Sequence, residues 1–308
     1  MESIVQTAMH IQIKYIKCKN VRGGWPATLL IWTTFDIIQD TFMQFASYNL
    51  WSQFEPAIDR EDIHCQMQRG WRWTQTARLD QSETPPLTET IWQKVGKLAQ
   101  QGVYEFHRDP LLLKHPRGSE RVADRLYLYY EIAAVRDRVM QIFRQYQANP
   151  WLLDREILVL HRGDEPIPPP IEIQVADDYF QLFAAFDWIV QASNRQIQII
   201  DFKTGLADPD RRQADVYLLA CSYLYPDFEA VASFYNLETM TSSELITATP
   251  DRLAEIAHKL AQIAKLHQQQ LQAYQLEPDR FDLLFPPHPG THCRACNFNY
   301  RCAYAAAC

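Results

Sequence analysis

The sequence predicts an α/β fold, in which a small mixed sheet is flanked by helices, and the change of apolar pattern along the chain supports it. Before residue 160 apolar residues recur at helical spacing, whereas short runs of strand length follow residue 170. The segment 162–170 (RGDEPIPPP) divides the two regions, because so many prolines suit neither a helix nor an inner strand. Helical and strand-like segments then alternate toward the C-terminus, as in α/β proteins.

Two helices are predicted before the proline-rich segment. The first covers residues 89–107, where apolar side chains recur at helical spacing from Ile91 to Phe106. The second is expected to run unbroken over 119–147, with Ser119 as its N-cap. Its apolar stripe consists of Val122, Leu126, Tyr129, Ile132 and Val135. Earlier in the chain, residues 9–16 alternate partly like a strand.

The second half of the chain predicts strands and two further helices. Residues 180–190 and 196–202 read as strands joined by a polar turn at 191–195. The remaining expected elements are a helix over 210–224, a strand over 230–235, an amphipathic helix over 250–274 and a loop-like tail over 285–308. The predicted organisation is therefore an unclear segment 1–58, a helical region 59–160, a core with its C-terminal helix 161–284, and a cysteine-bearing tail 285–308.

Composition and charge narrow the class of protein. With 308 residues, 47% of them hydrophobic, the chain is long enough for one large core or two smaller ones. A net charge of −7 and a pI near 5.7 argue against a broad basic surface, although not against a local one. The uncharged stretch 23–35 is too short to span a bilayer, and no secretory signal is recognised. We expect a cytoplasmic protein without membrane association.

The central part of the chain carries a set of residues suited to metal-assisted hydrolysis of phosphodiesters. Asp187 lies in an apolar strand, and Asp201 and Lys203 lie two apart on the next strand, so that the latter two share a face. Two carboxylates suit Mg²⁺, and a lysine beside them is placed to orient or help deprotonate an attacking water. Gln213 and Tyr217 share one face of the following helix. Glu172 is a candidate for one further ligand.

This conjunction resembles the PD-(D/E)XK nuclease superfamily, in particular its RecB-like and Cas4-like branch. The resemblance rests on a strand ending in Asp-x-Lys-Thr-Gly (201–205) and a helix with Gln-x-x-x-Tyr (213–217), and it is clearest over 180–225. It implies a restriction-endonuclease-like core, with Asp187 and Asp201 as ligands of Mg²⁺ or Mn²⁺ and Lys203 as the catalytic lysine. Gln213 and Tyr217 would then form the accessory motif of this branch.

Two positions depart from the pattern of that branch. Gln100 stands where many members have a metal-ligating histidine, and an amide oxygen brings no charge to a cation. His107, two helical turns further on, is the alternative ligand. The second departure is Ala184 and Ala185, which stand before Asp187 where many members have glycine.

Cysteines gather at the C-terminus. Cys293, Cys296 and Cys302 have a spacing that suits zinc or an iron–sulfur cluster, and a fourth ligand is needed. The Cas4-like resemblance implies a [4Fe–4S] cluster, with Zn²⁺ as the alternative, and a distant N-terminal cysteine as the fourth ligand. Cys65 is favoured for that role although it lacks the usual Cys-Pro-Arg context, and Cys308 competes with it. The two remaining cysteines, Cys18 and Cys221, read as ordinary thiols.

These observations predict a metal-dependent DNA nuclease that acts on single strands or strand ends in repair, recombination or foreign-DNA processing. DNA is the expected partner, and a helicase or an integrase-type protein is a candidate second partner. Two other functions stay open: a non-catalytic DNA-binding or scaffold protein with the same fold, and a zinc-stabilised regulatory module. The basic residues near the motifs are Lys203, Arg211, Arg212, Arg294 and Arg301, and the tryptophans considered for base stacking are Trp71, Trp73 and Trp92.

Overall fold

The computed structural model describes residues 44–57, 64–76 and 89–305. The chain separates into two units, Met1–Asp40 and Thr41–Cys308, and every described residue belongs to the second. The strand-like stretch 9–16, Cys18 and Cys308 therefore lie outside the described residues. Within the described part of the chain, no helix has both the length and the apolar character that a membrane crossing requires.

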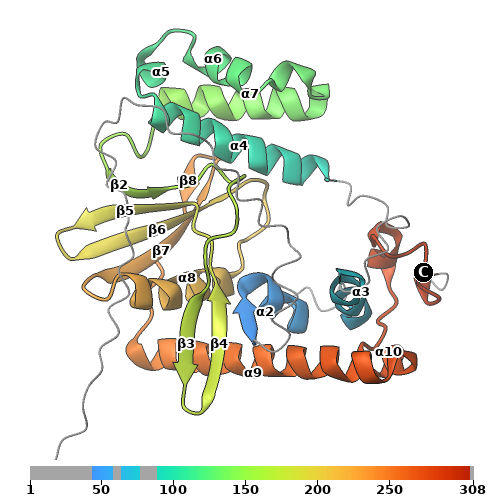
Figure 1. Ribbon diagram of the computed structural model, residues 1–308. Coiled ribbons are helices and arrows are strands. Elements are labelled where there is room, and N and C mark those ends of the chain that lie inside the picture. Colours follow the sequence, from blue (N-terminus) through green and yellow to red (C-terminus); the bar gives the residue numbers. More distant parts are fainter. Residues whose placement is uncertain (1–43, 58–63, 77–88, 306–308) are drawn as a thin grey trace, which may run out of the picture. The chain divides into compact units, whose positions relative to one another are not determined.

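A five-stranded mixed sheet carries the predicted site residues. Strands β6 and β7 are parallel, as a connection through a helix allows, and the other neighbouring strands are antiparallel. Helices cover both faces of this sheet, which explains why the central strand β6 is almost wholly buried (Figure 1). In sheet order the strands are β2 (Glu156–Leu160), β5 (Trp188–Ser193), β6 (Gln196–Lys203), β7 (Glu229–Asn236) and β8 (Thr241–Ser242).

Alternate residues of β6 enter two different cores, as the pleat of a strand requires. Ile197 and Ile199 pack with helices α8 (Arg211–Leu224) and α9 (Pro250–Leu276). Ile200 and Phe202 pack on the opposite face with α4 (Ile91–Arg108) and α7 (Ala133–Ala148). The α/β class expected from the sequence is confirmed.

A second sheet, of three strands, holds the residues just before the site. Its order is β1 (Phe45–Ser47), β4 (Asp178–Phe183) and β3 (Ile171–Val175), with β1 parallel and β3 antiparallel to β4. The prediction of one strand over 180–190 is therefore wrong, because β4 and β5 belong to different sheets. The chain crosses between the sheets at 184–187, and apolar residues on both sides of the crossing conceal it in the sequence.

The predicted helix over 119–147 is also broken. The structure has α6 (Gly118–Arg125), a 3₁₀ turn η2 (Leu128–Tyr130) and then α7. Tyr127 adopts a left-handed conformation with φ 53°, which ends the first helix. Ser119 lies inside α6 instead of capping it, and Tyr129 and Ile132 are 57% and 59% exposed. The apolar stripe is thus interrupted at the break, and it resumes in α7 with Val135, which is buried.

The first predicted helix is confirmed as α4, which begins with a capping box between Thr90 and Gln93. It packs against α7 at close range, since a Cβ added to Gly102 would lie 1.9 Å from Phe143 Cε1. The short helix α5 (Leu111–Lys114) joins α4 to α6.

The remaining helices surround α9 and the C-terminal tail. α2 (Tyr48–Phe54) and α3 (Gln66–Thr76) follow β1. α9 packs against the three-stranded sheet, and α3 packs against the short helix α10 (Phe281–Leu284) around Met67, Phe281 and Phe285. The other turns of the tail are η3 (Pro278–Arg280) and η4 (Thr291–Ala295).

Candidate active site

The predicted acidic and basic residues meet at one end of the five-stranded sheet. Asp201 and Lys203 are two residues apart on β6, so both side chains leave the face that α8 covers. The register of β5 and β6 pairs Trp188 with Ile200, which places Asp187, the residue before β5, beside Asp201. Sequence spacing and strand register thus bring the three charged groups together.

Helix α8 brings Gln213 and Tyr217 to the same place. Asp210 is the N-cap of this helix, and its side chain accepts a hydrogen bond from the Arg212 backbone N–H at 3.0 Å. The two residues lie one turn apart and face β6.

A hydrogen-bond network joins Asp201 and Lys203 to α8. Asp201 Oδ1 accepts from Gln213 Nε2 at 2.8 Å and from the Tyr217 hydroxyl at 2.9 Å. Lys203 Nζ donates to Gln213 Oε1 at 2.7 Å and lies 2.5 Å from Asp201 Oδ2. The amide of Gln213 therefore orients both the carboxylate and the ammonium group.

Asp187 has a separate set of partners. Its Oδ2 accepts from the Phe202 backbone N–H at 2.8 Å, and its Oδ1 accepts from Gln100 Nε2 at 2.9 Å. Gln100 comes from α4, so two helices on different faces of the sheet reach the two aspartates. Of the three residues considered as additional ligands, Gln100, His107 and Glu172, Gln100 is the one that contacts Asp187.

The electrostatics of the site show an excess of negative charge. Burial, followed by repulsion from Asp201, raises the pKa of Asp187 to about 7. Burial and the same two carboxylates hold the pKa of Tyr217 well above its ordinary value, so its hydroxyl stays protonated and donates. Neutralising both carboxylates requires more positive charge than Lys203 supplies.

The donor set fits a divalent cation such as Mg²⁺ or Mn²⁺. Asp201 Oδ2 is buried, and among the described residues the partner recorded for it is the ammonium group of Lys203, at 2.5 Å. Among the described residues, no three His, Cys, Asp or Glu side chains form a complete metal site. Proteins commonly bind Mg²⁺ through two carboxylates, and water and substrate then occupy the remaining coordination positions.

Two other predicted ligands lie elsewhere. His107 Nε2 is 2.7 Å from the Tyr146 hydroxyl, and burial lowers the pKa of His107 to about 4. Its ring also packs edge-on against Trp188, at 4.7 Å between centroids. Glu172 is exposed on β3 of the other sheet, beside Tyr179.

Several of the basic and aromatic residues considered for DNA contact are already engaged within the fold. Arg212 is paired with Asp210, and the Arg301 guanidinium stacks on Trp71 at 4.0 Å. Trp73 packs against His267 within the fold, whereas Trp92 is 60% exposed.

The contacts that His161 makes with the backbone at Phe186 and Asp187 were not predicted from the sequence. The His161 backbone N–H donates to the Asp187 carbonyl at 2.9 Å, and His161 Nδ1 lies 2.7 Å from the Phe186 carbonyl oxygen. Gly163, with φ 89°, lets this loop approach Gln100, whose Oε1 would lie 2.7 Å from an added Cβ. The glycine in the proline-rich segment was the available signal for this close contact.

The cysteines form a second group. Cys65 and Cys302 pack at the edge of the Met67 core, and Cys302 Sγ is 3.7 Å from Met67 Sδ. Burial first, and then the nearby thiols of Cys65, Cys293 and Cys302, raise the pKa of Cys296. The backbone N–H of Gly290 donates to Cys293 Sγ at 3.4 Å. The four cysteines are free thiols, and Cys65, Cys293 and Cys302 each lie within electrostatic reach of Cys296.

Together, the fold and the site define an α/β protein of the nuclease class. A family model described as the PD-(D/E)XK nuclease superfamily matches residues 65–303, and the chain belongs to this superfamily. Membership implies a metal-dependent nuclease that hydrolyses phosphodiester bonds, and it agrees with the expected restriction-endonuclease-like fold.

Comparison with solved structures and curated proteins adds little detail. The structure titled "Crystal structure of SSO0001" is similar at 12% identity, with 78% of this chain and 95% of that chain covered and a TM-score of 0.29. None of the curated proteins matches the chain significantly.

Proposed function

We propose that the protein is a Mg²⁺- or Mn²⁺-dependent deoxyribonuclease of the RecB-like and Cas4-like branch, acting on single-stranded DNA or strand ends. The observation that carries this proposal is the convergence of Asp187, Asp201 and Lys203 at one end of β5 and β6, described above. Two carboxylates beside an ammonium group suit the hydrolysis of a phosphodiester.

The metal ligands in this proposal are Asp187 and Asp201. The bound cation would polarise the phosphate and lower the pKa of a coordinated water. Gln100 turns its amide N–H toward Asp187, so ligation through its oxygen requires the opposite amide orientation. With its N–H directed at Asp187, the amide of Gln100 positions that carboxylate.

The protein groups prepare the attacking water. Lys203 orients it and promotes loss of its proton, while Gln213 holds Lys203 in place. Tyr217, which stays protonated, donates to Asp201 and keeps that carboxylate from turning away. The water oxygen bonds to phosphorus, the bond from phosphorus to the leaving oxygen breaks, and that oxygen gains a proton.

End-labelled single-stranded DNA with Mg²⁺ or Mn²⁺ tests the proposal. We expect Lys203→Ala to lower the cleavage rate by roughly 10²-fold or more. Lys265→Ala is the matched control, because Lys265 is exposed on α9 and pairs with Asp178. Equal activity of wild type and Lys203→Ala, or none in either, removes the enzymatic proposal.

The cysteine group supports a second part of the proposal, a [4Fe–4S] cluster held by Cys65, Cys293, Cys296 and Cys302. Thiolates are the ligands of such clusters, and three thiols lie within electrostatic reach of the Cys296 thiol here. A cluster at this place would tie α3 to the C-terminal tail, which makes its role structural.

Anaerobic purification followed by iron, sulfide and zinc analysis tests the cluster. Brown protein containing iron and sulfide supports it, and colourless protein with one zinc ion supports the zinc-stabilised alternative. Cys65→Ser and Cys308→Ser identify the fourth ligand. We expect loss of bound metal in Cys65→Ser and retention in Cys308→Ser.

A non-catalytic DNA-binding or scaffold protein with this fold is the second candidate function. The observation that favours it is Gln100, an uncharged amide, in contact with Asp187. Binding of DNA without cleavage under any divalent metal would support this candidate. A role in repair, recombination or foreign-DNA processing, with a helicase or integrase-type partner, belongs to the nuclease proposal.

A further inference from the structure

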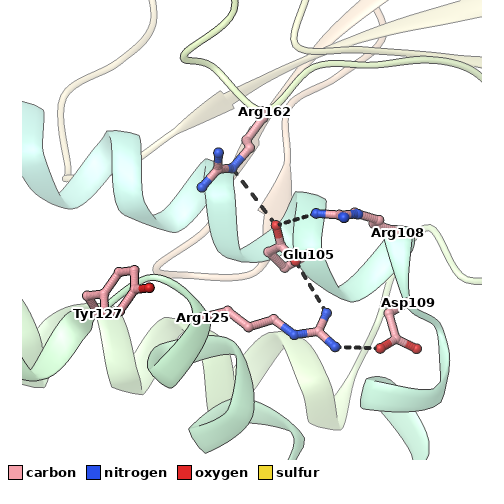
Figure 2. A pocket seen from close by; sticks show the side chains of 6 residues that line it. All are labelled: Glu105, Arg108, Asp109, Arg125, Tyr127 and Arg162. Atoms are coloured by element: carbon pink, nitrogen blue, oxygen red, sulfur yellow. Dashed lines mark hydrogen bonds and ion pairs between the residues drawn. The ribbon is translucent and has the colours of Figure 1, made fainter. Parts of the chain in front are cut away.

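A cavity of about 530 Å³ opens between α4, α6 and the loop after β2 (Figure 2). Three arginines, one from each of these segments, point toward the carboxylate of Glu105 (Figure 2): Arg108 from α4, Arg125 from α6 and Arg162 from the loop. The lining residues are Glu105, Arg108, Asp109, Arg125, Tyr127 and Arg162. None of them belongs to the acidic site described above.

The arginines are only partly satisfied by that carboxylate. Glu105 is 4% exposed, and it lies 3.4 Å from Arg108 Nη1, 3.3 Å from Arg125 Nη1 and 3.9 Å from Arg162 Nε. Arg162 Nε is buried, and no described residue accepts a hydrogen bond from it. Since each guanidinium has five N–H donors, one shared carboxylate leaves many of them unused.

Two further acidic residues, Asp109 and Asp164, pair with arginines of the cavity. Asp109 pairs with Arg125 at 2.7 Å, and Asp164 pairs with Arg162 Nη1 at 3.1 Å. The Arg108 side chain is 65% exposed, and within the described part of the chain it forms an ion pair with Glu105 alone. The group of three arginines and three acids is neutral overall, so unused directional donors, rather than net charge, favour an oxyanion here.

The cavity lies along the helix that reaches the acidic site. Gln100, which contacts Asp187, and Glu105 are five residues apart on α4, or about 7.5 Å along its axis. Arg162 directly follows His161, which braces Asp187.

Exposed tyrosines adjoin the cavity. Tyr127 lines it, and Tyr127, Tyr129 and Tyr130 are 64%, 57% and 77% exposed. The ring centroids of Tyr129 and Tyr130 are 4.1 Å apart, and each is 6.5 Å from that of Tyr127. Aromatic rings that face solvent suit stacking on unpaired bases of any sequence.

We propose that this cavity binds a phosphate group of a single nucleic-acid strand while the three tyrosines stack on its bases. The strand is thereby positioned with the bond to be cleaved at Asp187 and Asp201. This inference rests on the proposed nuclease function and adds to it a phosphate-binding cavity outside the acidic site.

Binding of a fluorescent single-stranded oligonucleotide, measured by anisotropy in EDTA over a range of salt concentrations, tests the inference. Arg108→Gln and Arg162→Gln are compared with Arg280→Gln, which removes the same charge from an exposed position on η3. We expect each pocket variant to bind more weakly, with a salt slope smaller by about 0.7 for the lost phosphate contact. Arg280→Gln should match the wild type.

The tyrosines are tested in the same assay. Tyr130→Ala should weaken binding by roughly fivefold or more, from the loss of one stacked base, and leave the salt slope unchanged. Oligonucleotides with a 5′-phosphate, a 3′-phosphate or neither distinguish a terminal phosphate from an internal one. Tighter binding of one phosphorylated form identifies a terminal group, and equal binding of all three identifies an internal phosphodiester.

The inference and the proposed function fail in different ways. If wild type binds and cleaves the strand but both pocket variants keep its affinity and salt slope, the arginines only hold the fold together and the inference is overturned. Wild type that neither binds nor cleaves overturns both proposals. Should Arg162→Gln fail to fold, the more exposed Arg108→Gln still decides the outcome.

Discussion

Gln100 Nε2 donates a hydrogen bond to Asp187 Oδ1 at 2.9 Å, which connects α4 directly to the acidic site. The same amide group lies 3.4 Å from the His161 carbonyl oxygen, on the loop that braces Asp187 from behind. The orientation of Asp187 therefore depends on a helix that lies on the far face of the sheet from α8.

Gln100→Ala should raise the Mn²⁺ concentration needed for half-maximal cleavage. The loss of the amide frees the Asp187 carboxylate to turn, so the two aspartates are less well arranged for one cation. Gln101→Ala is the matched control, because Gln101 lies next on α4 and donates to Asp164. Equal metal requirements in the two variants would show that Gln100 does not position Asp187.

Tyr217→Phe tests the link between α8 and Asp201. The variant keeps the ring and removes the hydroxyl that donates to Asp201 Oδ1. We expect a lower cleavage rate and a loss of about 1 kcal/mol in the free energy of unfolding, typical of one hydrogen bond. Tyr223→Phe, at a 45% exposed position of α8, should change neither quantity. An unchanged rate in Tyr217→Phe would limit this tyrosine to a packing role.

The site was predictable where its parts are close in sequence. Asp201, Lys203, Gln213 and Tyr217 lie on one strand and the helix that follows it, so strand and helix periodicity already place them on facing surfaces. The β5–β6 pairing is also local, and it brings Asp187 beside Asp201.

Features that depend on distant packing were not predictable. The chain leaves one sheet after β4 and enters the other at β5, and the continuous apolar run over this part of the sequence does not reveal the crossing at 184–187. The turn at Tyr127 needs a left-handed residue, for which tyrosine is an unusual choice. The arginine cavity combines three separate segments, so no spacing in the sequence indicates it.

Buried histidines should make the protein less stable in mild acid. Burial lowers the pKa of His107 to about 4, and burial with the Arg69 charge lowers the pKa of His267 to about 3. Below the ordinary histidine pKa of about 6.5 the unfolded chain binds protons that the folded protein does not. Each histidine therefore reduces the free energy of unfolding as the pH falls from about 6.5 toward its folded pKa.

Urea unfolding of wild type and His107→Gln at pH 7 and pH 5 isolates this effect. Asp187, whose pKa is raised, acts with the opposite sign, so the difference between variants is the informative quantity. We expect the stability of His107→Gln to depend less on pH than that of wild type. His258→Gln, which replaces an exposed histidine of α9, should behave like wild type. The same pH dependence in all three proteins would contradict a neutral buried His107.

Substitution by alanine should destabilise the protein at one glycine of α4 and not at the other. A Cβ at Gly102 would lie 1.9 Å from Phe143 Cε1 in the core, and overpacking of this kind costs about 1–3 kcal/mol. At Gly96 the nearest atom is Thr204 Oγ1 at 3.3 Å, where a small shift relieves the contact, and alanine favours a helix over glycine by about 1 kcal/mol. Urea unfolding should therefore show Gly102→Ala destabilised and Gly96→Ala equal to wild type or more stable. Because both substitutions add one methyl group to the same helix, equal effects would mean that α4 and α7 do not approach as closely as the structure indicates.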